Sequence, residues 1–304
     1  MVEVSYVGNI GKDETSGIPN NPAQFITDPL TGAPPSESNV NDRVLFEPGI
    51  LAPSQLVYMN YAHSSYNALQ IQATKRFGHG STILANYTRA KSLDETSSVT
   101  YYGNAFNPNN LNENYGPSDF DRRNSFVVSW LYAIPIHFSN SVANSLLSGW
   151  TLAAIHTIST GLPITFIAGE DVAVNGTGFN QFAQLQPGAA VSTIQISHPN
   201  RASMVNEFFN TKAFVPTNDE PLGTYGNTRR GMIYGPAYAD TDASILKLFT
   251  LPESLKLQFR LETFNTFNQV NFSNPNSTVT SGAFGQIQSA NSGRQLQLAL
   301  KLLW

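Results

Sequence analysis

The sequence has no cysteine and few charged residues. Its 304 residues include no Cys, which excludes disulfide bonds and thiol catalysis. Charged residues make up 12% of the chain, against about 25% in ordinary soluble domains. The polarity comes instead from Asn, Ser, Thr, Gln and Gly. Because the net charge is −4 and no basic block is present, we expect no nucleic-acid partner.

Long apolar runs and a recognisable leader are also missing. No stretch approaches the ~20 apolar residues that a membrane helix needs, although the short alternating strands of a membrane barrel would not require one. The first residues, MVEVSYVGN, have neither the basic region nor the apolar core of a signal peptide. They enter directly into an alternating pattern, so we expect the chain to be a fragment of a longer protein.

What the sequence does contain is alternation, most clearly at its end. Residues 294–304 read RQLQLALKLLW, and a period of two predicts a β-strand with one apolar and one polar face. A strand of a soluble sandwich has the same pattern, so this segment alone does not decide between a protein core and lipid. The apolar face consists of Leu296, Leu298, Leu300, Leu302 and Trp304.

Seven further segments predict strands, which gives about eight in total. Their ranges are 2–7, 66–77, 81–91, 123–136, 149–161, 242–251 and 254–267. The connections between them alternate in length. The long ones are 8–63, 92–122, 162–238 and 268–293, and the short ones are 78–80, 137–148 and 252–253.

This regular alternation places every long loop at one end of an antiparallel meander, which is typical of bacterial outer-membrane barrels. We therefore predict an all-β fold: a transmembrane antiparallel β-barrel segment of about eight strands with long extracellular loops and short periplasmic turns. A soluble, carbohydrate-binding β-sandwich is a weaker hypothesis, because a sandwich has no reason to segregate its loops by length.

The barrel hypothesis assigns a direction to each side chain. Leu255, Leu257, Phe259 and Leu261 should face lipid, whereas a second set should line the lumen: Lys256, Gln258, Arg260, Glu262 and Lys301. Aromatic residues beside the short turns should lie at the periplasmic interface; in a sandwich they would be core residues instead. They are Phe77, Tyr132, Trp150, Phe249 and Trp304.

Candidate chemical sites are sparse. The segment SDFDRR groups Asp119, Asp121, Arg122 and Arg123 where a long loop enters a strand; we expect an ion-pair cluster at the loop rim, with substrate binding as the alternative. Arg229 and Arg230 in NTRRG are expected to stabilise loop structure, and His156 to have a packing or pore role. We expect no catalytic residues, no metal site and no cofactor, and hence no enzyme.

Several segments together resemble a known family. They are SSYNALQIQATKRFGHGSTILANYTRAKSLDE (64–95), GPSDFDRRNSFVVSWLYAIPI (116–136), SGWTLAAIHTISTGLPITF (148–166), FNTKAFVPTNDEPLGTYGNTRRGMIYGPAYADTDASILKLF (209–249), LKLQFRLETFNTFNQVNFSNPN (255–276) and FGQIQSANSGRQLQLALKLLW (284–304). In order and spacing they resemble the C-terminal part of the β-barrel of Oar-like TonB-dependent receptors, the outer-membrane transporters that carry a carboxypeptidase-regulatory-like domain. The resemblance is poorest over 8–60 and 167–205.

The resemblance implies a location, partners and a function. Residues 1–304 would be the C-terminal portion of an outer-membrane barrel in a Gram-negative bacterium, without the plug and N-terminal domains. The segment would belong to a receptor for uptake of a bulky nutrient and would not transport alone, since TonB acts through the missing N-terminal part. Membrane lipid and an unknown extracellular ligand would be partners. The final strand, Leu296 to Trp304, would be the signal that the barrel-assembly machinery reads.

One alternative stays open. Eight strands are enough to close a small barrel, so the chain could be a self-contained eight-stranded outer-membrane protein with a structural or adhesin-like role.

Overall fold

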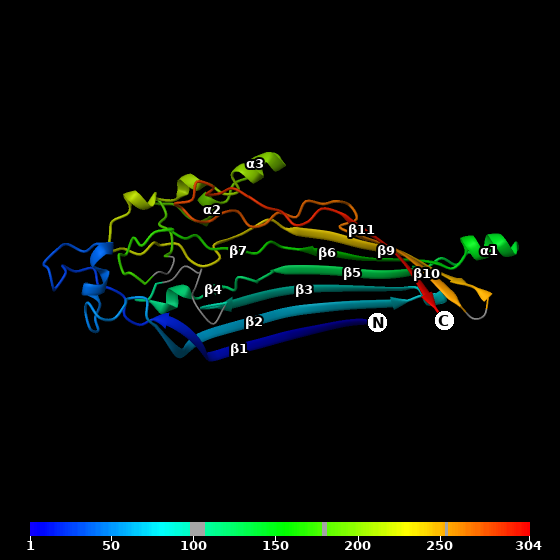
Figure 1. The fold of residues 1–304 in the computed structure, drawn as a ribbon, viewed down its shortest axis with the longest axis horizontal. Helices are drawn as coiled ribbons and strands as arrows, with labels where there is room; N and C mark the ends of the chain where they lie inside the picture. Colours follow the sequence, from blue (N-terminus) through cyan, green and yellow to red (C-terminus); the bar gives the residue numbers. More distant parts are fainter. Residues whose placement is uncertain (98–106, 178–180, 253–254) are drawn as a thin grey trace.

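An antiparallel sheet dominates the computed structural model, which describes residues 1–97, 107–177, 181–252 and 255–304, with His79 described by its backbone alone. In these ranges eight strands follow one another across the sheet (Figure 1). They are β1 (Val2–Pro19), β2 (Leu56–Arg76), β3 (Thr82–Asp94), β5 (Asn124–Ala133), β6 (Trp150–Ser159), β9 (Tyr238–Thr250), β10 (Lys256–Phe264) and β11 (Gln295–Leu303). The two-residue β4 (Gly116–Pro117) pairs with β3 beside this path.

The two ends of the sheet differ as the loop lengths predict. Every strand pair in the described ranges is antiparallel. Leu303 lies opposite Lys256, which lies opposite Thr250, so the C-terminus is beside the turn that includes Pro252. Glu253, placed in that turn by the sequence, lies outside the described residues. The expected meander and the position of its C-terminus are confirmed.

The first strand is much longer than expected. The sequence predicts a strand at 2–7 and a loop over 8–63, but β1 has 18 residues and β2 has 21, and the two pair from Val2–Ala73 to Pro19–Leu56 with irregularities near Glu14. Residues 8–19 lack the alternation that predicts strands. Outside the hydrocarbon a strand needs no apolar face, so its sequence carries no such signal. The first long connection is therefore 20–55.

The short turn between β5 and β6 contains α1 (Ser141–Leu147), and a 3₁₀ turn, Gly78–Gly80, joins β2 to β3. The long connections contain the remaining elements: β7 (Pro163–Ile164), β8 (Ile233–Tyr234), α2 (Val191–Ile194), α3 (Arg201–Asn206) and 3₁₀ turns at Glu37–Arg43, Leu111–Asn114, Thr211–Ala213 and Thr217–Asp219. None of the helices in the described ranges has the length and apolar character that crossing a membrane demands.

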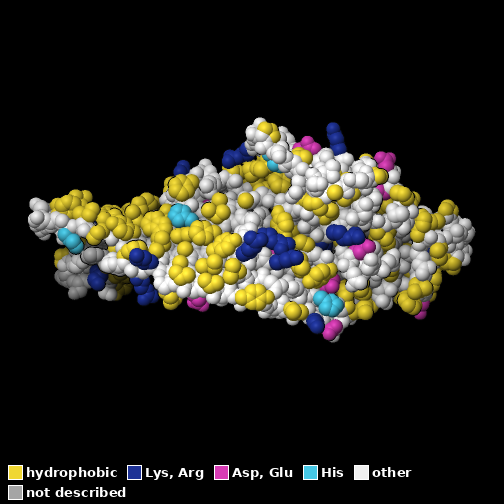
Figure 2. Space-filling view, turned by 180° about the vertical axis from the view of Figure 1, so that it is seen from behind, with side chains coloured by type: hydrophobic (Ala, Val, Ile, Leu, Met, Phe, Trp, Pro, Cys, Tyr) yellow, Lys and Arg dark blue, Asp and Glu magenta, His cyan; other side chains and the backbone are white. Residues whose placement is uncertain are grey.

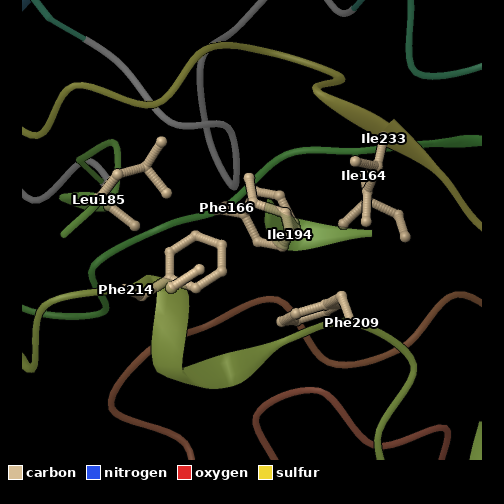
Figure 3. Close-up of a cluster of buried hydrophobic side chains, with 9 residues drawn as sticks. Ile164, Phe166, Leu185, Ile194, Phe209, Phe214 and Ile233 are labelled. Atoms are coloured by element: carbon tan, nitrogen blue, oxygen red, sulfur yellow. The ribbon is translucent and has the colours of Figure 1, made fainter. Parts of the chain in front are cut away.

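The main hydrophobic core lies in the long connections and not in the sheet. We call the described residues of 162–237 and 268–293 the loop body. Three aromatic rings pack at its centre: the centroid of Phe166 is 4.8 Å from that of Phe209 and 4.6 Å from that of Phe214 (Figure 3). The only parallel contact given for the described ranges, an isolated bridge between Ile167 and Thr278, is also here. The core residues are Ile164, Phe166, Ala183, Leu185, Ile194, Phe209, Ala213, Phe214 and Ile233.

Candidate membrane face and loop rim

The register of the sheet divides its side chains into two faces. Residues that are directly paired across an antiparallel ladder point to the same face, and β10 pairs Leu257, Phe259 and Leu261 with leucines of β11. Following the pairs from strand to strand extends this apolar face across the sheet. Its large apolar members include Val2, Val4, Tyr6, Leu69, Ile71, Ile83, Tyr87, Phe126, Val128, Trp130, Tyr132, Trp150, Leu152, Ile158, Ile245, Phe249, Leu257, Phe259, Leu261, Leu296, Leu298, Leu300 and Leu302.

Many of these side chains are open to the surroundings. Leu300 in the middle of β11 is 65% exposed and Val4 of β1 is 63% exposed. Figure 2 shows hydrophobic side chains dense over the strands and the short-turn end, and mostly polar atoms over the loop end. Contiguous apolar patches on soluble proteins rarely exceed a few hundred Å², so a face of this extent requires an apolar solvent.

The opposite face carries most of the polar side chains of the strands, together with some apolar ones such as Leu131, Ile155 and Leu248. The residues expected to line a lumen lie together there: Gln258 is paired with Lys301, and Arg260 approaches Glu262 to 3.4 Å. Lys256 belongs to the same face. Uncharged amides and hydroxyls continue this face on the other strands, at Ser5, Gln70, Gln72, Asn86, Thr88, Ser125, Ser129, Thr157, Ser244, Gln295 and Gln297.

His156 lies on the apolar face, not on the polar one. Trp130 donates its indole N–H to His156 Nε2 at 3.0 Å, so the ring hydrogen sits on Nδ1, which is 3.0 Å from Thr241 Oγ1. Both ring nitrogens are therefore satisfied, which is the condition for a polar group on a lipid-facing surface. Of the two roles expected for His156, this geometry fits packing.

Lys247 is a charged residue on the apolar face, and its position is unusual. It is paired with Trp150 and Phe259, only 3% exposed, and its Nζ donates to the carbonyl of Ser148. Its ammonium also lies 4.9 Å from the ring centroid of Phe249 and 5.5 Å from that of Trp150. Aromatic faces attract a cation electrostatically, so the charge is enclosed by rings at the short-turn end.

Asp121 organises one part of the loop rim. It is 2% exposed, accepts a hydrogen bond from the amide of Ser92 at 2.7 Å and lies 2.9 Å from Arg123 Nε. Tyr234 of β8 donates its hydroxyl to Asp121 at 2.7 Å and accepts from Arg123 at 2.6 Å. Burial, together with the hydrogen bond to Asp121, raises the pKa of Tyr234 to about 12. This triad joins the end of β3 and the entry of β5 to the loop body.

Arg230 organises the other part of the loop rim. Its guanidinium is buried and lies 2.6 Å from Asp94 Oδ1 and 3.2 Å from Asp119 Oδ1. It also donates to the carbonyls of Asp94 at 2.7 Å and Asn114 at 3.3 Å, and to Ser97 Oγ at 3.0 Å. Arg is suited to this role because its planar fork of donors can satisfy several acceptors at once. The 92–122 connection is thereby fastened to the loop body.

The four residues expected to form the rim cluster thus divide among different partners. Asp121 pairs with Arg123, whereas Asp119 pairs with Arg230, which the cluster hypothesis did not include. The expectation for Arg122 needs correction: among the described residues its partners are Ser159 Oγ at 2.9 Å and the carbonyl of Thr160 at 2.8 Å, and no carboxylate. Arg122 therefore anchors the loop to the end of β6. The neighbouring glycine in NTRRG offered a weak signal for Arg230, since it marks a close backbone approach.

A metal centre is not evident in the described ranges, where no three His, Asp or Glu side chains are placed to hold a metal ion. What the arrangement does define is a class of protein. An antiparallel sheet with one apolar and one polar face, short turns at one end and long folded loops at the other is the wall of an outer-membrane β-barrel.

Comparison with known protein families supports this class of protein. A family model described as "Outer membrane beta barrel domain" matches residues 1–297, and the chain belongs to this family. No curated protein matches the chain. The family assignment places the protein in the outer membrane of a Gram-negative bacterium. The matched range ends before Leu298, so most of the proposed assembly signal lies beyond it.

Proposed function

We propose that this chain is the C-terminal barrel segment of an Oar-like TonB-dependent receptor that takes up a bulky nutrient. Two features support the proposal. The order and spacing of the segments over 64–304 resemble this receptor family, and one face of the sheet carries polar residues on each of its eight strands. In the receptor, the polar face would line the passage and the loop body would meet the ligand first.

The observation that carries the proposal is that the sheet has two open edges. Within the described ranges, β1 and β11 have a partner on one side only. The part of each strand that crosses the hydrocarbon therefore has one row of unpaired backbone groups. Each unpaired backbone group in hydrocarbon costs several kcal/mol. Strands of a larger barrel would cover both edges.

The length of β1 also bears on whether the sheet can close on itself. A six-residue first strand would make a poor seam, but β1 is long enough to pair with all of β11. This observation favours the second candidate function, a self-contained eight-stranded barrel with a structural or adhesin-like role. Under that alternative, the upper half of β1 would stand above the membrane, where water satisfies its edge.

Expression of the chain with an added signal peptide distinguishes the receptor segment from the self-contained barrel. A closed barrel gives a heat-modifiable, protease-resistant band in outer membranes. We expect no such band from this chain alone, and we expect one when the N-terminal barrel strands of an Oar-like receptor precede it, which controls for simple misfolding. A monomeric band from the chain alone would establish the eight-stranded barrel instead.

A further inference from the structure

The turn between β5 and β6 differs from an ordinary periplasmic turn. Residues 134–149 contain no Lys, Arg, Asp or Glu, and α1 occupies the centre of the turn. Five large apolar side chains of the turn are exposed: Ile136, Phe138, Val142, Leu146 and Leu147. A turn that met only water would gain nothing from this composition.

The helix is amphipathic despite its length. At about 100° per residue, its apolar side chains fall within an arc of about 140°, and its polar ones occupy the opposite side. The apolar arc contains Val142, Ala143, Leu146 and Leu147; the polar arc contains Ser141, Asn144 and Ser145. Asn140 caps the helix by accepting from the amide of Ala143 at 3.0 Å, which fixes where it begins.

Two contacts fasten this turn to the apolar face of the sheet. The indole N–H of Trp150 donates to the carbonyl of Leu146 at 3.1 Å, and Lys247 Nζ donates to the carbonyl of Ser148. Both side chains belong to the face that meets lipid. The exposed apolar residues of the turn therefore continue the lipid-facing surface at its periplasmic border, where α1 lies beyond the ends of the strands (Figure 1).

We propose that α1 is an interfacial anchor whose apolar arc enters the periplasmic leaflet of the outer membrane, with phospholipid as its partner. A helix of this kind lies in the plane of the interface, its polar arc toward water and its apolar arc among the acyl chains. Lys247 acts as a positioning residue: it does not reach the headgroups, because rings enclose its ammonium, but it holds the turn against the sheet.

The absence of cysteine makes a direct test simple, since single-cysteine variants need no other change. Spin labels are placed at Leu146→Cys and, as the matched control on the same helix, at Asn144→Cys. The full chain is refolded into vesicles of phosphatidylethanolamine with a minor share of phosphatidylglycerol. We expect the label at 146 to collide with oxygen several-fold more, relative to a water-soluble nickel chelate, than the label at 144.

Labels at Leu298→Cys and Gln258→Cys report whether the two faces of the sheet have separated into lipid and water. If they have not, the same four labels are compared in dodecylphosphocholine micelles, where detergent covers apolar surface without a closed barrel. Equal access of the nickel chelate to positions 144 and 146, with Leu298→Cys protected, overturns the proposal. Protection of 146 in native outer membranes but not in pure lipid also overturns it, in favour of a protein partner.

Discussion

The sheet and the loop body of this protein use apolar residues in opposite ways. In the loop body, Phe166 and Phe209 are fully buried and pack edge to face, as in the core of a water-soluble domain. In the sheet, Leu298 and Leu300 are each 65% exposed. The same hydrophobic effect produces both arrangements, because the sheet is solvated by hydrocarbon and the loop body by water.

Polar residues show the inverse contrast. At the loop rim, Arg230 and Asp94 are buried and satisfied by several partners. On the apolar face, His156 and Lys247 are tolerated only because neighbouring side chains and a carbonyl take up their hydrogen bonds. A membrane protein therefore needs two separate stabilisation schemes in one chain, and substitutions should reveal which scheme operates at each position.

The largest expected effect is in the loop body. Phe166→Ala removes a ring from the centre of the aromatic cluster, and a buried Phe→Ala substitution typically costs about 3–5 kcal/mol. We expect hydrogen exchange and proteolysis to increase across 162–237 while the amides of β5 and β6 remain protected. Phe120→Ala is the control, because Phe120 is 63% exposed in the neighbouring connection. If β5 and β6 lost protection as well, the two regions would form one cooperative unit.

The second prediction tests the faces of the sheet. Leu261→Arg places a charge on the apolar face near the middle of β10, opposite Leu298 and Ile245, and should cost about 2–4 kcal/mol in a bilayer. Gln258→Arg on the polar face should cost little. Equilibrium unfolding from vesicles measures both changes in the barrel that the N-terminal strands of an Oar-like receptor complete. Equal penalties would mean that both faces are packed against protein, as in a soluble sandwich.

The sequence was sufficient to predict the sheet but not the loop body. The strands that span the hydrocarbon must alternate because one face meets lipid and the other meets water. The residue type at positions such as Leu257 and Gln258 therefore predicts the face on which each side chain lies. The upper half of β1, with Gly11 and Gly17, is held by backbone pairing with β2. Backbone pairing does not require particular side chains, so the length of β1 could not be predicted from the sequence.

The rim shows the same limit at the level of side chains. Asp121 and Arg123 are close in sequence, so their pairing was accessible to sequence reasoning. Arg230 reaches Asp94 across 136 residues, and that proximity exists only after the loop body has folded. Long-range polar networks depend on tertiary structure, and a single sequence gives no register for them.

The third prediction concerns pH and again separates the two regions. Glu220 of the loop body is buried, its Oε1 has no hydrogen-bond partner, and burial raises its pKa from 4.5 to about 7. The folded state therefore binds the proton more tightly than the unfolded state, so stability should fall as the pH rises from about 4.5 to about 7. This loss is at most roughly 3 kcal/mol, at 1.4 kcal/mol per pKa unit.

Glu220→Gln should remove that pH dependence, stabilising the loop body at pH 8 and changing little at pH 4. Exchange rates within 181–237 at the two pH values provide the measurement, with Glu207→Gln, at an exposed position, as the control. A similar gain from both variants, or an equal gain at both pH values, would rule out Glu220 as the source. The strands of the sheet should not respond.

The smallest effect should come from Lys247→Met, although its site is the most unusual on the apolar face. Methionine keeps most of the side-chain length but loses the bond to Ser148 and the attraction of the Trp150 and Phe249 rings, each cation–π contact being worth about 0.5–2 kcal/mol. The variant also no longer holds a charge away from water, which offsets much of that loss. We therefore expect the free energy of unfolding of the same completed barrel from vesicles to change by less than about 1 kcal/mol. The local consequence should be larger: amides of 141–149 should exchange faster because the turn has lost one of its two ties to the sheet, while β9 and β10 keep their protection.

Leu248→Met is the control for a change of side chain alone, because Leu248 is the next residue of β9 and lies on the opposite, polar face. Unchanged exchange in 141–149 would show that Trp150 holds the turn without help, and a global loss of several kcal/mol would show that the enclosed ammonium stabilises the sheet itself.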